Sequence, residues 1–560
     1  MGKAARNIKS SLITLNPIFF TRLLSISPLK SFVFSPKKNS RNQKNHCSSA
    51  NLTLLFFLSL FILCTFLGIC ILTFVPISQN SIPCSMISPS SPFSPFVLAS
   101  LSSIVKDYSN SVLDEQPTTL STSAMVPLPP HGFSGNLSEE EREFWQQPDG
   151  EGYRPCLDFS LGYRKSSARI SKERRKFLVV VVSGGLNQQR NQIVDAVVIA
   201  RVLEAALVVP VLQVNRIWGD ESEFSDIFDV EHFKKTLQAD VRVVMSLPST
   251  HLVSRQSVEN QIPSHVSPTW IRARFLRQLN EEGLLILKGL DSKLSKSLPP
   301  DLQKLRCKVA FHALRFSTPI RELGNQMARR MWIEGSYVAI HLRLEKDVWI
   351  RTGCLTGLGP KHDNIIARDR ESHPDFLTDK LNMSNTARRL AGFCPLNSLE
   401  VARLLKALGA PSNARIYVAG GDPFGGTYAL QPLVEEFPNI VTKQMLARGD
   451  ELSPYTNRPS VLAAIDYIVC LSSDVFMPSH GGNMGRALQG HRAYVGHRKY
   501  VKPNKRMMIP FFEDMSISEE EFSSVIQKLH KNSKGQPEQR TKMIGRDVLA
   551  YPVPECMCNH

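Results

Sequence analysis

Short apolar runs alternate with helical patterns along the chain beyond about residue 150. The run Phe177-Leu-Val-Val-Val-Val-Ser183 has no polar alternation, which is typical of a buried parallel strand covered on both faces. Gly184 and Gly185 turn the chain, and from Asn191 onwards apolar residues recur at the spacing of one helix face. A further apolar run at 207–212 predicts a second strand, so this stretch forms a βαβ unit.

The same alternation returns in the second half of the sequence. The pattern predicts strands at 337–342, 415–420, more weakly 440–441, and 475–477, with helices at 398–408 and 461–470. This predicts an α/β fold of two Rossmann-like domains whose parallel sheets face a cleft. Ligands of such sheets bind beyond the carboxyl ends of the strands, so the loops after the strands are the places to search.

A different pattern precedes these domains. Residues 52–75 are 24 consecutive positions without a charge, and as a helix they would span about 36 Å, enough for a hydrocarbon core of about 30 Å. Nine lysines and arginines and no acid precede this run, while 76–105 carries no charge. The positive-inside bias therefore predicts a single-pass type II signal anchor with a cytosolic N-terminus.

Two other kinds of N-terminal segment share some of these features. A cleaved signal peptide fits poorly, because the charged region and the apolar run both exceed its usual length. An organelle transit peptide is the second alternative, since the first 50 residues contain Arg and Ser and no acid.

The charge of the chain is concentrated before the anchor. The 560 residues carry a formal charge of +17, and the length favours two or more domains. Nucleic-acid binding is disfavoured, because the densest basic stretch would face the cytosol and the folded part the lumen. The 42% hydrophobic content excludes a wholly disordered chain.

Composition also suggests the domain boundaries. Pro76 to Pro148 contains ten prolines and long Ser/Thr stretches, which predicts a flexible stem that buries little. The expected parts are a cytosolic basic segment (1–51), the anchor (52–75), the stem (76–150), an N-terminal Rossmann-like domain (151–333), a C-terminal Rossmann-like domain (334–515), and a C-terminal helix with a Cys-containing tail (516–560).

Cysteines and sequons beyond the anchor favour an oxidising, lumenal compartment. Cys470 lies in an apolar run and is expected to be a buried thiol. The tail 556–560 contains two cysteines and a histidine, but no second group of ligands at the usual spacing, so a metal site there is not expected. Asn136 and Asn382 begin glycosylation sequons. The eight cysteines of this part, whose disulfide pairing the sequence leaves open, are Cys84, Cys156, Cys307, Cys354, Cys394, Cys470, Cys556 and Cys558.

The loop after the first strand reads Gly184-Gly-Leu-Asn-Gln-Gln-Arg190. Glycines after a strand let backbone N–H groups approach an anion, and the following helix N-terminus favours negative charge. The loop lacks the dinucleotide fingerprint and the P-loop ending. Its amides and its cation suit sugar hydroxyls and phosphate; the alternative is a simple tight turn.

The loop after strand 337–342 holds the leading candidate for catalysis. Strand alternation points His341, Arg343 and Glu345 to one side. The Arg343 guanidinium is a candidate clamp for a diphosphate, through two charge-assisted hydrogen bonds worth about 1.5–3 kcal/mol each. These bonds strengthen as a leaving group gains charge, which favours the transition state. The alternative is a structural Arg–Glu pair at the strand end.

A third group of motifs lies near the last predicted strand. Ser472-Ser-Asp474 precedes the strand, and Gly481-Gly-Asn-Met-Gly-Arg486 and Gly490-His-Arg492 follow it. A serine–acid pair and a Gly-Gly-Asn loop that opens a helix fit nucleotide binding. Asp474 is a candidate base or ribose acceptor, and the alternative is a helix-capping aspartate.

Together these motifs resemble the plant O-fucosyltransferase family. The resemblance rests on segments 184–190, 341–347, 394–397 with 420–426, and 473–476 with 482–484 and 490–492, in the same order over about 153–558. It implies a GT-B glycosyltransferase with the donor in the cleft and with no required metal or cofactor. It also implies a Golgi-type type II membrane protein with a lumenal catalytic domain, or an endoplasmic reticulum relative.

What the resemblance implies for single residues follows the motifs. Arg343 becomes the donor-phosphate clamp and leading catalytic residue, with His341 beside it. Independently of the resemblance, the carboxylates Glu345 and Asp347 of the same loop are candidates to accept a proton late. Ser473 and Asp474 are expected near the guanosine or the β-phosphate. The expected donor-binding set is Gly184, Gly185, Leu186, Asn187, Gln188, Arg190, His341, Leu342, Arg343, Ser473, Asp474, Gly482, Asn483 and Arg486.

The chain departs from the family pattern at three places. Gly184 stands where some animal relatives have a glutamate base, so the resemblance implies no general base. Residues 348–352 replace a Met-Leu-Ala-Phe-Ser run, and His480-Gly481 replaces an aromatic–acid pair. These departures bear on the choice of donor or acceptor.

The expected function is therefore inverting transfer of fucose from GDP-fucose to a hydroxyl of a protein or a cell-wall glycan. One alternative is a rhamnosyltransferase that acts on pectin with UDP-rhamnose. An alternative of another class is a non-catalytic, membrane-anchored glycan-binding protein, which the presence of Arg343 and the Gly-Asn loops disfavours.

Overall fold

The computed structural model describes residues 125–132, 137–170, 175–215, 217–251, 258–259, 262–291, 293–373 and 383–559. They belong to one compact unit. The predicted anchor, the cytosolic segment, most of the predicted stem, Cys84 and the sequon residues Asn136 and Asn382 lie outside these ranges. Within the described ranges, no helix is both long and apolar enough to cross a membrane.

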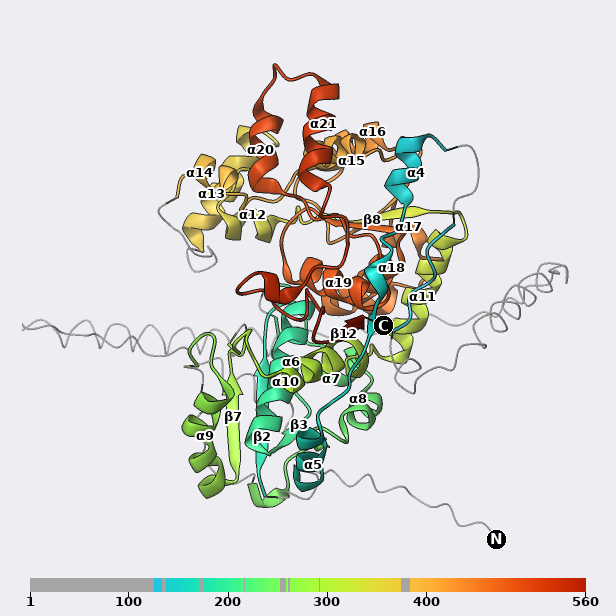
Figure 1. Cartoon of the computed structure of the whole chain (residues 1–560). Coiled ribbons are helices and arrows are strands. Elements are labelled where there is room, and N and C mark those ends of the chain that lie inside the picture. The colour runs from blue at the N-terminus through green and yellow to red at the C-terminus, as the bar shows by residue number, and fades with distance from the viewer. Residues whose placement is uncertain are drawn as a thin grey trace, which may run out of the picture. The chain divides into compact units, whose positions relative to one another are not determined.

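A parallel sheet of six strands organises the N-terminal part. Its order is β5-β3-β2-β7-β6, with β4 also paired to β2. The strands are β2 (Phe177–Val182), β3 (Ala206–Val208), β4 (Val211–Leu212), β5 (Val243–Val244), β6 (Val258–Glu259) and β7 (Leu284–Lys288). The helices of this part are α5 (Leu161–Ile170), α6 (Leu186–Leu203), α7 (Phe224–Ile227), α8 (Val230–Leu237), α9 (Pro268–Glu282), α10 (Pro300–Lys308) and α11 (Thr318–Trp332) (Figure 1).

The first βαβ unit is confirmed, with one correction. All six residues of β2 are buried, as an apolar run between two helical layers requires. The single strand predicted at 207–212 is wrong, because the chain breaks into β3 and β4 at Pro210, which has no N–H to donate to a ladder. Both pieces pair with β2, and Val209 between them donates to the carbonyl of Val244.

The C-terminal part contains a second parallel sheet, in the order β10-β9-β8-β11. The strands are β8 (Tyr337–His341), β9 (Arg415–Ala419), β10 (Ile440–Thr442) and β11 (Val475–Pro478), which confirms the four predicted strands within a residue or two. Its helices are α12 (Lys346–Thr352), α13 (Pro360–Ser372), α14 (Asn385–Leu390), α15 (Ser398–Ala407), α16 (Thr427–Glu436), α17 (Lys443–Leu446), α18 (Pro459–Ser472), α19 (Asn483–Tyr494), α20 (Lys505–Glu513) and α21 (Glu519–His530). Short 3₁₀ or π segments are Gly150–Gly152, Ser249–His251, Val309–Ala313, Ser453–Tyr455 and Arg540–Lys542.

The two sheets share one hydrophobic core. The same cluster of buried side chains contains Val180 of β2, Ile193 of α6, Tyr337 of β8 and Ile465 of α18. A smaller cluster fills the space between the second sheet and helices α15, α20 and α21. The expected α/β architecture with two parallel sheets is confirmed. Buried side chains also fill the region between the two sheets.

Part of the predicted stem is folded. Helix α4 (Glu139–Trp145) buries Phe144 to 1% exposure in the second core, and the backbone N–H of Leu128 donates to Ser472 Oγ (3.3 Å). The prediction that 76–150 buries little is therefore wrong for 125–132 and 137–150. A buried side chain such as Phe144 is enough to hold this Pro-rich part of the chain against the C-terminal sheet and its helices.

The C-terminal tail returns to the N-terminal part. Strand β12 (Met557–Asn559) pairs antiparallel with β1 (Tyr153–Pro155). Two disulfides, Cys156–Cys558 and Cys307–Cys556, fasten this tail, and a third joins Cys354 to Cys394. Within the described residues Cys470 is a buried thiol outside any disulfide, as predicted.

The Gly-His-Arg motif at 490–492 packs in the interior. The Arg492 guanidinium donates to the carbonyls of Cys470 (2.9 Å) and Leu471 (3.2 Å) at the end of α18, and Arg498 donates to that of Ser472 (3.0 Å). These cations satisfy carbonyls that a helix end leaves unpaired. Burial, and then the neighbouring Arg498, lower the pKa of Arg492 to about 9, so it stays charged at neutral pH.

Gly490→Ala should be strongly destabilising, because a Cβ there would lie 1.7 Å from the carbonyl oxygen of Leu549, which is backbone. We expect a loss of about 3 kcal/mol or more in the free energy of unfolding. Gly162→Ala in the first turn of α5 is the matched control: its nearest neighbour would be 3.8 Å away, and an exposed substitution of this kind should change stability by about 0.5 kcal/mol at most. Equal thermal midpoints of the two variants would contradict the argument.

Candidate active site

A cavity of about 820 Å³ lies at the carboxyl ends of the strands of both sheets, within the range of small-molecule sites. Every wall loop follows a strand, as the α/β rule predicts. The loops are 185–188 after β2, 217–218 after β4, 341–348 after β8, 420–422 after β9, 443–444 after β10, and 480–484 after β11. Residues 350–352 at the end of α12 and one face of α18 complete the wall.

The cavity brings together ten of the predicted site residues. They are Gly185, Leu186, Asn187, Gln188, His341, Arg343, Glu345, Asp347, Gly482 and Asn483. Six others do not line it, namely Gly184, Arg190, Leu342, Ser473, Asp474 and Arg486. The contacts of the residues in each group are described in turn below.

Arg343 is held by two carboxylates. Its Nη1 lies 3.4 Å from Glu345 Oε1, and its Nη2 lies 3.2 Å from Asp347 Oδ2. Asp347 also accepts from Arg351 Nη2 (2.6 Å). The structural Arg–Glu pair named as the alternative exists, but it stands on the cavity wall with the Arg343 side chain 18% exposed. The pairing therefore orients a guanidinium that a ligand can reach.

Two polar atoms of the wall are buried without a hydrogen-bond partner in the described structure. They are His341 Nδ1 and Glu345 Oε2. Burial first, and then Arg343, lower the pKa of His341 well below its usual value, so the imidazole is neutral. An unpaired buried polar atom costs about 1–3 kcal/mol, and polar atoms of a bound ligand would remove that cost.

Two helices begin at the cavity with open N-termini. Helix α6 starts after Gly185 and α19 after Gly482, and neither N-cap has a side-chain hydrogen bond. The first N–H groups of a helix are unpaired by construction and favour an anion. Gly185 also lies against an aromatic ring, because a Cβ there would be 3.0 Å from Cζ3 of Trp218.

The amide loop combines cavity residues with a structural arginine. Arg190 is buried, donates to Asn187 Oδ1 (3.3 Å) and the Ala310 carbonyl (3.1 Å), and lies 4.4 Å over the Tyr467 ring. It therefore fixes the Asn187 amide from behind. Gln188 donates to Asp291 Oδ2 (2.7 Å).

Ser473 and Asp474 lie away from the cavity. Asp474 accepts from the N–H groups of His131 (2.8 Å) and Tyr337 (3.0 Å) and pairs with the His131 ring. Burial alone would raise the pKa of Asp474, but the hydrogen bonds from His131 and Tyr337 lower it. Ser473 Oγ donates to the Cys470 carbonyl. Through these hydrogen bonds Ser473 and Asp474 join the end of α18 to β8 and to the segment 125–132. The contacts give no support to the expected role of the two residues at the nucleotide.

The other three predicted residues outside the cavity differ in kind. Leu342 is buried in the second core, and Arg486 is exposed on α19. Gly184 has φ +89°, and a Cβ on it would collide with the Gln188 side chain, so glycine is required there for the turn.

Sequence reasoning missed several wall residues. Lys443 and Asp466 form a buried ion pair (3.0 Å), and Asp466 also accepts from Tyr417 OH (2.6 Å) and the N–H of Gly420 (3.1 Å). An aspartate inside the apolar helix pattern 461–470 was the available signal. The sequence around Trp218 and Arg351 carries no comparable signal, and His480 stands out only as a departure from the family pattern.

The wall gives no indication of a bound metal. Within the described ranges, no three His, Cys, Asp or Glu side chains are grouped as they would be to hold an ion. The cations Arg343, Arg351, Lys346 and Lys443 supply the positive charge of the wall.

These features define an α/β protein with two parallel sheets and a cavity prepared for a phosphorylated ligand at the strand ends. The model of the GDP-fucose protein O-fucosyltransferase family matches residues 177–495. O-fucosyltransferase 37 of Arabidopsis thaliana is 61% identical over all of this chain and 98% of its own length. O-fucosyltransferase 20 of Brassica napus is 53% identical over 96% of this chain and 94% of its own. The chain belongs to the O-fucosyltransferase family.

Solved structures are more distant. A crystal structure of POFUT1 in complex with GDP is 14% identical, covering 60% of this chain and all of that one, with a TM-score of 0.35. A POFUT1 complex with GDP-fucose has the same TM-score at 13% identity, covering 59% of this chain and 98% of that one.

His480 should make the fold sensitive to acid. Burial first, and then Lys505, Arg343, Arg351 and Arg486, lower its pKa to about 3. A folded pKa below the unfolded value of about 6.5 stabilises the fold above pH 6.5, and this contribution is lost as the pH falls. Between pH 7 and pH 5 we expect His480 to contribute about 1–2 kcal/mol to the loss of stability.

Urea unfolding at the two pH values measures this effect. His480→Gln should lose less stability between pH 7 and pH 5 than the wild type. The same substitution at the exposed His373 should leave the wild-type difference unchanged. An equal loss in the wild type and in His480→Gln would rule the effect out.

Proposed function

We propose that this protein is a glycosyltransferase that moves fucose from GDP-fucose to a hydroxyl group of an acceptor. The observation that carries the proposal is the position of Arg343 on the cavity wall, beside the unpaired atoms of His341 and Glu345. Membership of the O-fucosyltransferase family supports fucose and GDP as the sugar and the nucleotide.

In the proposed reaction Arg343 stabilises the leaving group. The acceptor oxygen attacks the anomeric carbon, the bond from this carbon to the β-phosphate oxygen breaks, and its electron pair leaves with GDP. Guanidinium N–H groups strengthen their hydrogen bonds as this oxygen gains charge, so they favour the transition state over the bound donor. The open N-terminus of α19 adds unpaired N–H groups on the same wall.

Glu345 is the better placed of the two candidate carboxylates to take the acceptor proton. Asp347 Oδ2 is shared between Arg343 and Arg351. Glu345 uses Oε1 for Arg343 and the N–H of Gly421 (2.9 Å), while Oε2 has no partner within the described structure. In this proposal the Glu345 carboxylate, whose side chain is 16% exposed, accepts the proton late, as the bond to GDP breaks.

Three further features belong to the proposal. The sheets are arranged as in a GT-B enzyme, with the donor between them. The sugar is transferred with inversion, because one displacement from the opposite face requires no covalent intermediate. Arg343 and the α19 N-terminus carry the diphosphate charge without a metal ion.

Nucleotide binding tests the donor. Adding GDP to the purified full-length chain should raise its thermal midpoint, and UDP should not. Arg343→Ala should keep its fold and lose the GDP shift, with transfer from GDP-fucose falling by about 10²–10³-fold. Arg277→Ala, which removes an 88% exposed arginine, is the matched control and should leave both unchanged.

Other outcomes select the alternatives. A response to UDP in place of GDP would support rhamnosyl transfer. Unchanged turnover in Arg343→Ala would contradict Arg343 as the clamp. No response to either nucleotide and no transfer by the wild type would favour the non-catalytic glycan-binding protein.

We also propose that residues 52–75 anchor the protein in the Golgi membrane, with the catalytic part in the lumen. Support comes from the uncharged run with its basic flank, and from three disulfides, which persist in oxidising compartments. The acceptor is a protein or a glycan of that compartment.

The orientation has a direct test. The full chain should resist carbonate extraction from membranes, and deletion of 52–75 should release it. Asn136→Gln and Asn382→Gln should each remove one glycosidase-sensitive mass increment. Digestion of the catalytic part by protease added to intact vesicles would contradict the lumenal orientation.

A further inference from the structure

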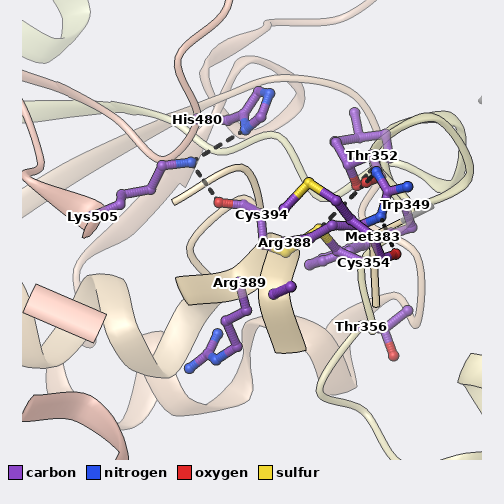
Figure 2. The surroundings of a disulfide bond; sticks show 12 residues. Trp349, Thr352, Cys354, Thr356, Met383, Arg388, Arg389, Cys394, His480 and Lys505 are labelled. Atoms are coloured by element: carbon purple, nitrogen blue, oxygen red, sulfur yellow. Dashed lines mark hydrogen bonds between the residues drawn. A yellow bond between two sulfur atoms is a disulfide. The ribbon is translucent and has the colours of Figure 1, made fainter. Parts of the chain in front are cut away.

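The Cys354–Cys394 disulfide lies near two residues of the cavity wall, Thr352 and His480 (Figure 2). Cys354 follows α12 by one residue, and Cys394 precedes α15. Their exposures are 1% and 5%, so reagents in solution do not reach the sulfur atoms in the folded state. These positions suit a permanent link better than a redox switch.

On one side the disulfide fixes α12. This helix carries Asp347 and Arg351, whose ion pair orients the Arg343 guanidinium. Seven residues are too few for a stable isolated helix. The disulfide holds its end together with two arginines. Arg388 donates to the Thr352 carbonyl (3.2 Å), and Arg370 donates to the carbonyls of Trp349 (2.7 Å), Ile350 and Cys354.

On the other side the disulfide fixes the loop between β11 and α19. The N–H of Leu396 donates to the Ser479 carbonyl (3.0 Å), and Ser479 Oγ accepts from the N–H of Arg343 (3.0 Å). Lys505 Nζ donates to the Cys394 carbonyl and lies 3.5 Å from His480 Nδ1 (Figure 2). The Cys394 segment thus supports the loop that carries His480 and Gly482 into the cavity.

We propose that the Cys354–Cys394 disulfide is a positioning element of the donor site, which holds the Arg343–Asp347–Arg351 wall against the 479–483 loop at the spacing of a diphosphate. The inference rests on the proposed function for the identity of the donor. Its effect should fall on recognition of the β-phosphate more than on overall stability.

The three disulfides differ in a way that separates these two effects. Cys354–Cys394 closes 40 residues, whereas Cys307–Cys556 and Cys156–Cys558 span 249 and 402. In the chain-entropy account, a longer closed loop restrains the unfolded chain more. The tail disulfides should therefore contribute more to stability. None of the six cysteines lines the cavity, but Cys354 lies two residues after the wall residue Thr352.

The experiment compares two double variants of the full-length chain, Cys354→Ser/Cys394→Ser and the control Cys156→Ser/Cys558→Ser. Titration calorimetry with GDP and with GMP measures the preference for the β-phosphate, and thermal unfolding measures stability. We expect the first variant to lose tenfold or more in GDP affinity and most of the preference for GDP over GMP. The control should keep both within about twofold while its thermal midpoint falls further.

A second pair, Cys354→Ala/Cys394→Val, replaces the sulfur atoms with apolar groups and should show the same loss of preference. An unchanged GDP/GMP ratio in either pair, or an equal loss in the control, would overturn the proposal. Failure of both pairs to fold would also overturn it, by assigning the bond to fold stability. Failure of the wild type to bind GDP would instead contradict the proposed function.

Discussion

The structure depends on how the buried helix α18 satisfies its polar groups. Its C-terminal end lies in the interior, and its first residues, Pro459 and Ser460, lie on the cavity wall. A buried carbonyl or N–H that stays unpaired costs about 1–3 kcal/mol. At the C-terminal end Arg492 and Arg498 donate to the last carbonyls. At the N-terminal end Asp220 accepts from the N–H of Ser460 (2.6 Å). In the middle Asp466, paired with Lys443, reaches the cavity wall.

This constraint explains why two prominent motifs are not part of the cavity. Ser473 and Asp474 follow α18 directly, and Arg492 donates to the backbone carbonyl of each (2.9 and 3.0 Å). Position 490 requires a glycine because the backbone of the C-terminal tail at Leu549 packs directly against it. Serine, aspartate, glycine and arginine in series suggested nucleotide binding, but here they terminate a buried helix and join it to the next strand.

The limits of prediction from the sequence follow from the range of the interactions. Strands such as β2 and β8 were predictable because burial on both faces leaves a continuous apolar run, and the loop after β8 was predictable as a site because strand ends converge. Trp218 was not, since its place beside Gly185 depends on two distant loops. Helix α4 was missed because Phe144 is buried by a core formed more than 190 residues later, at β8 and beyond. Interactions that join distant segments leave no local pattern.

The cavity wall is balanced in charge before any ligand arrives. Arg343 and Arg351 face Glu345 and Asp347, and Lys443 faces Asp466. A row of unpaired cations at this place would repel one another in a partly desolvated site. The carboxylates remove that cost, so the fold keeps the guanidinium groups at fixed positions. A diphosphate then meets oriented donors, and the ordering of these side chains is already accomplished by folding.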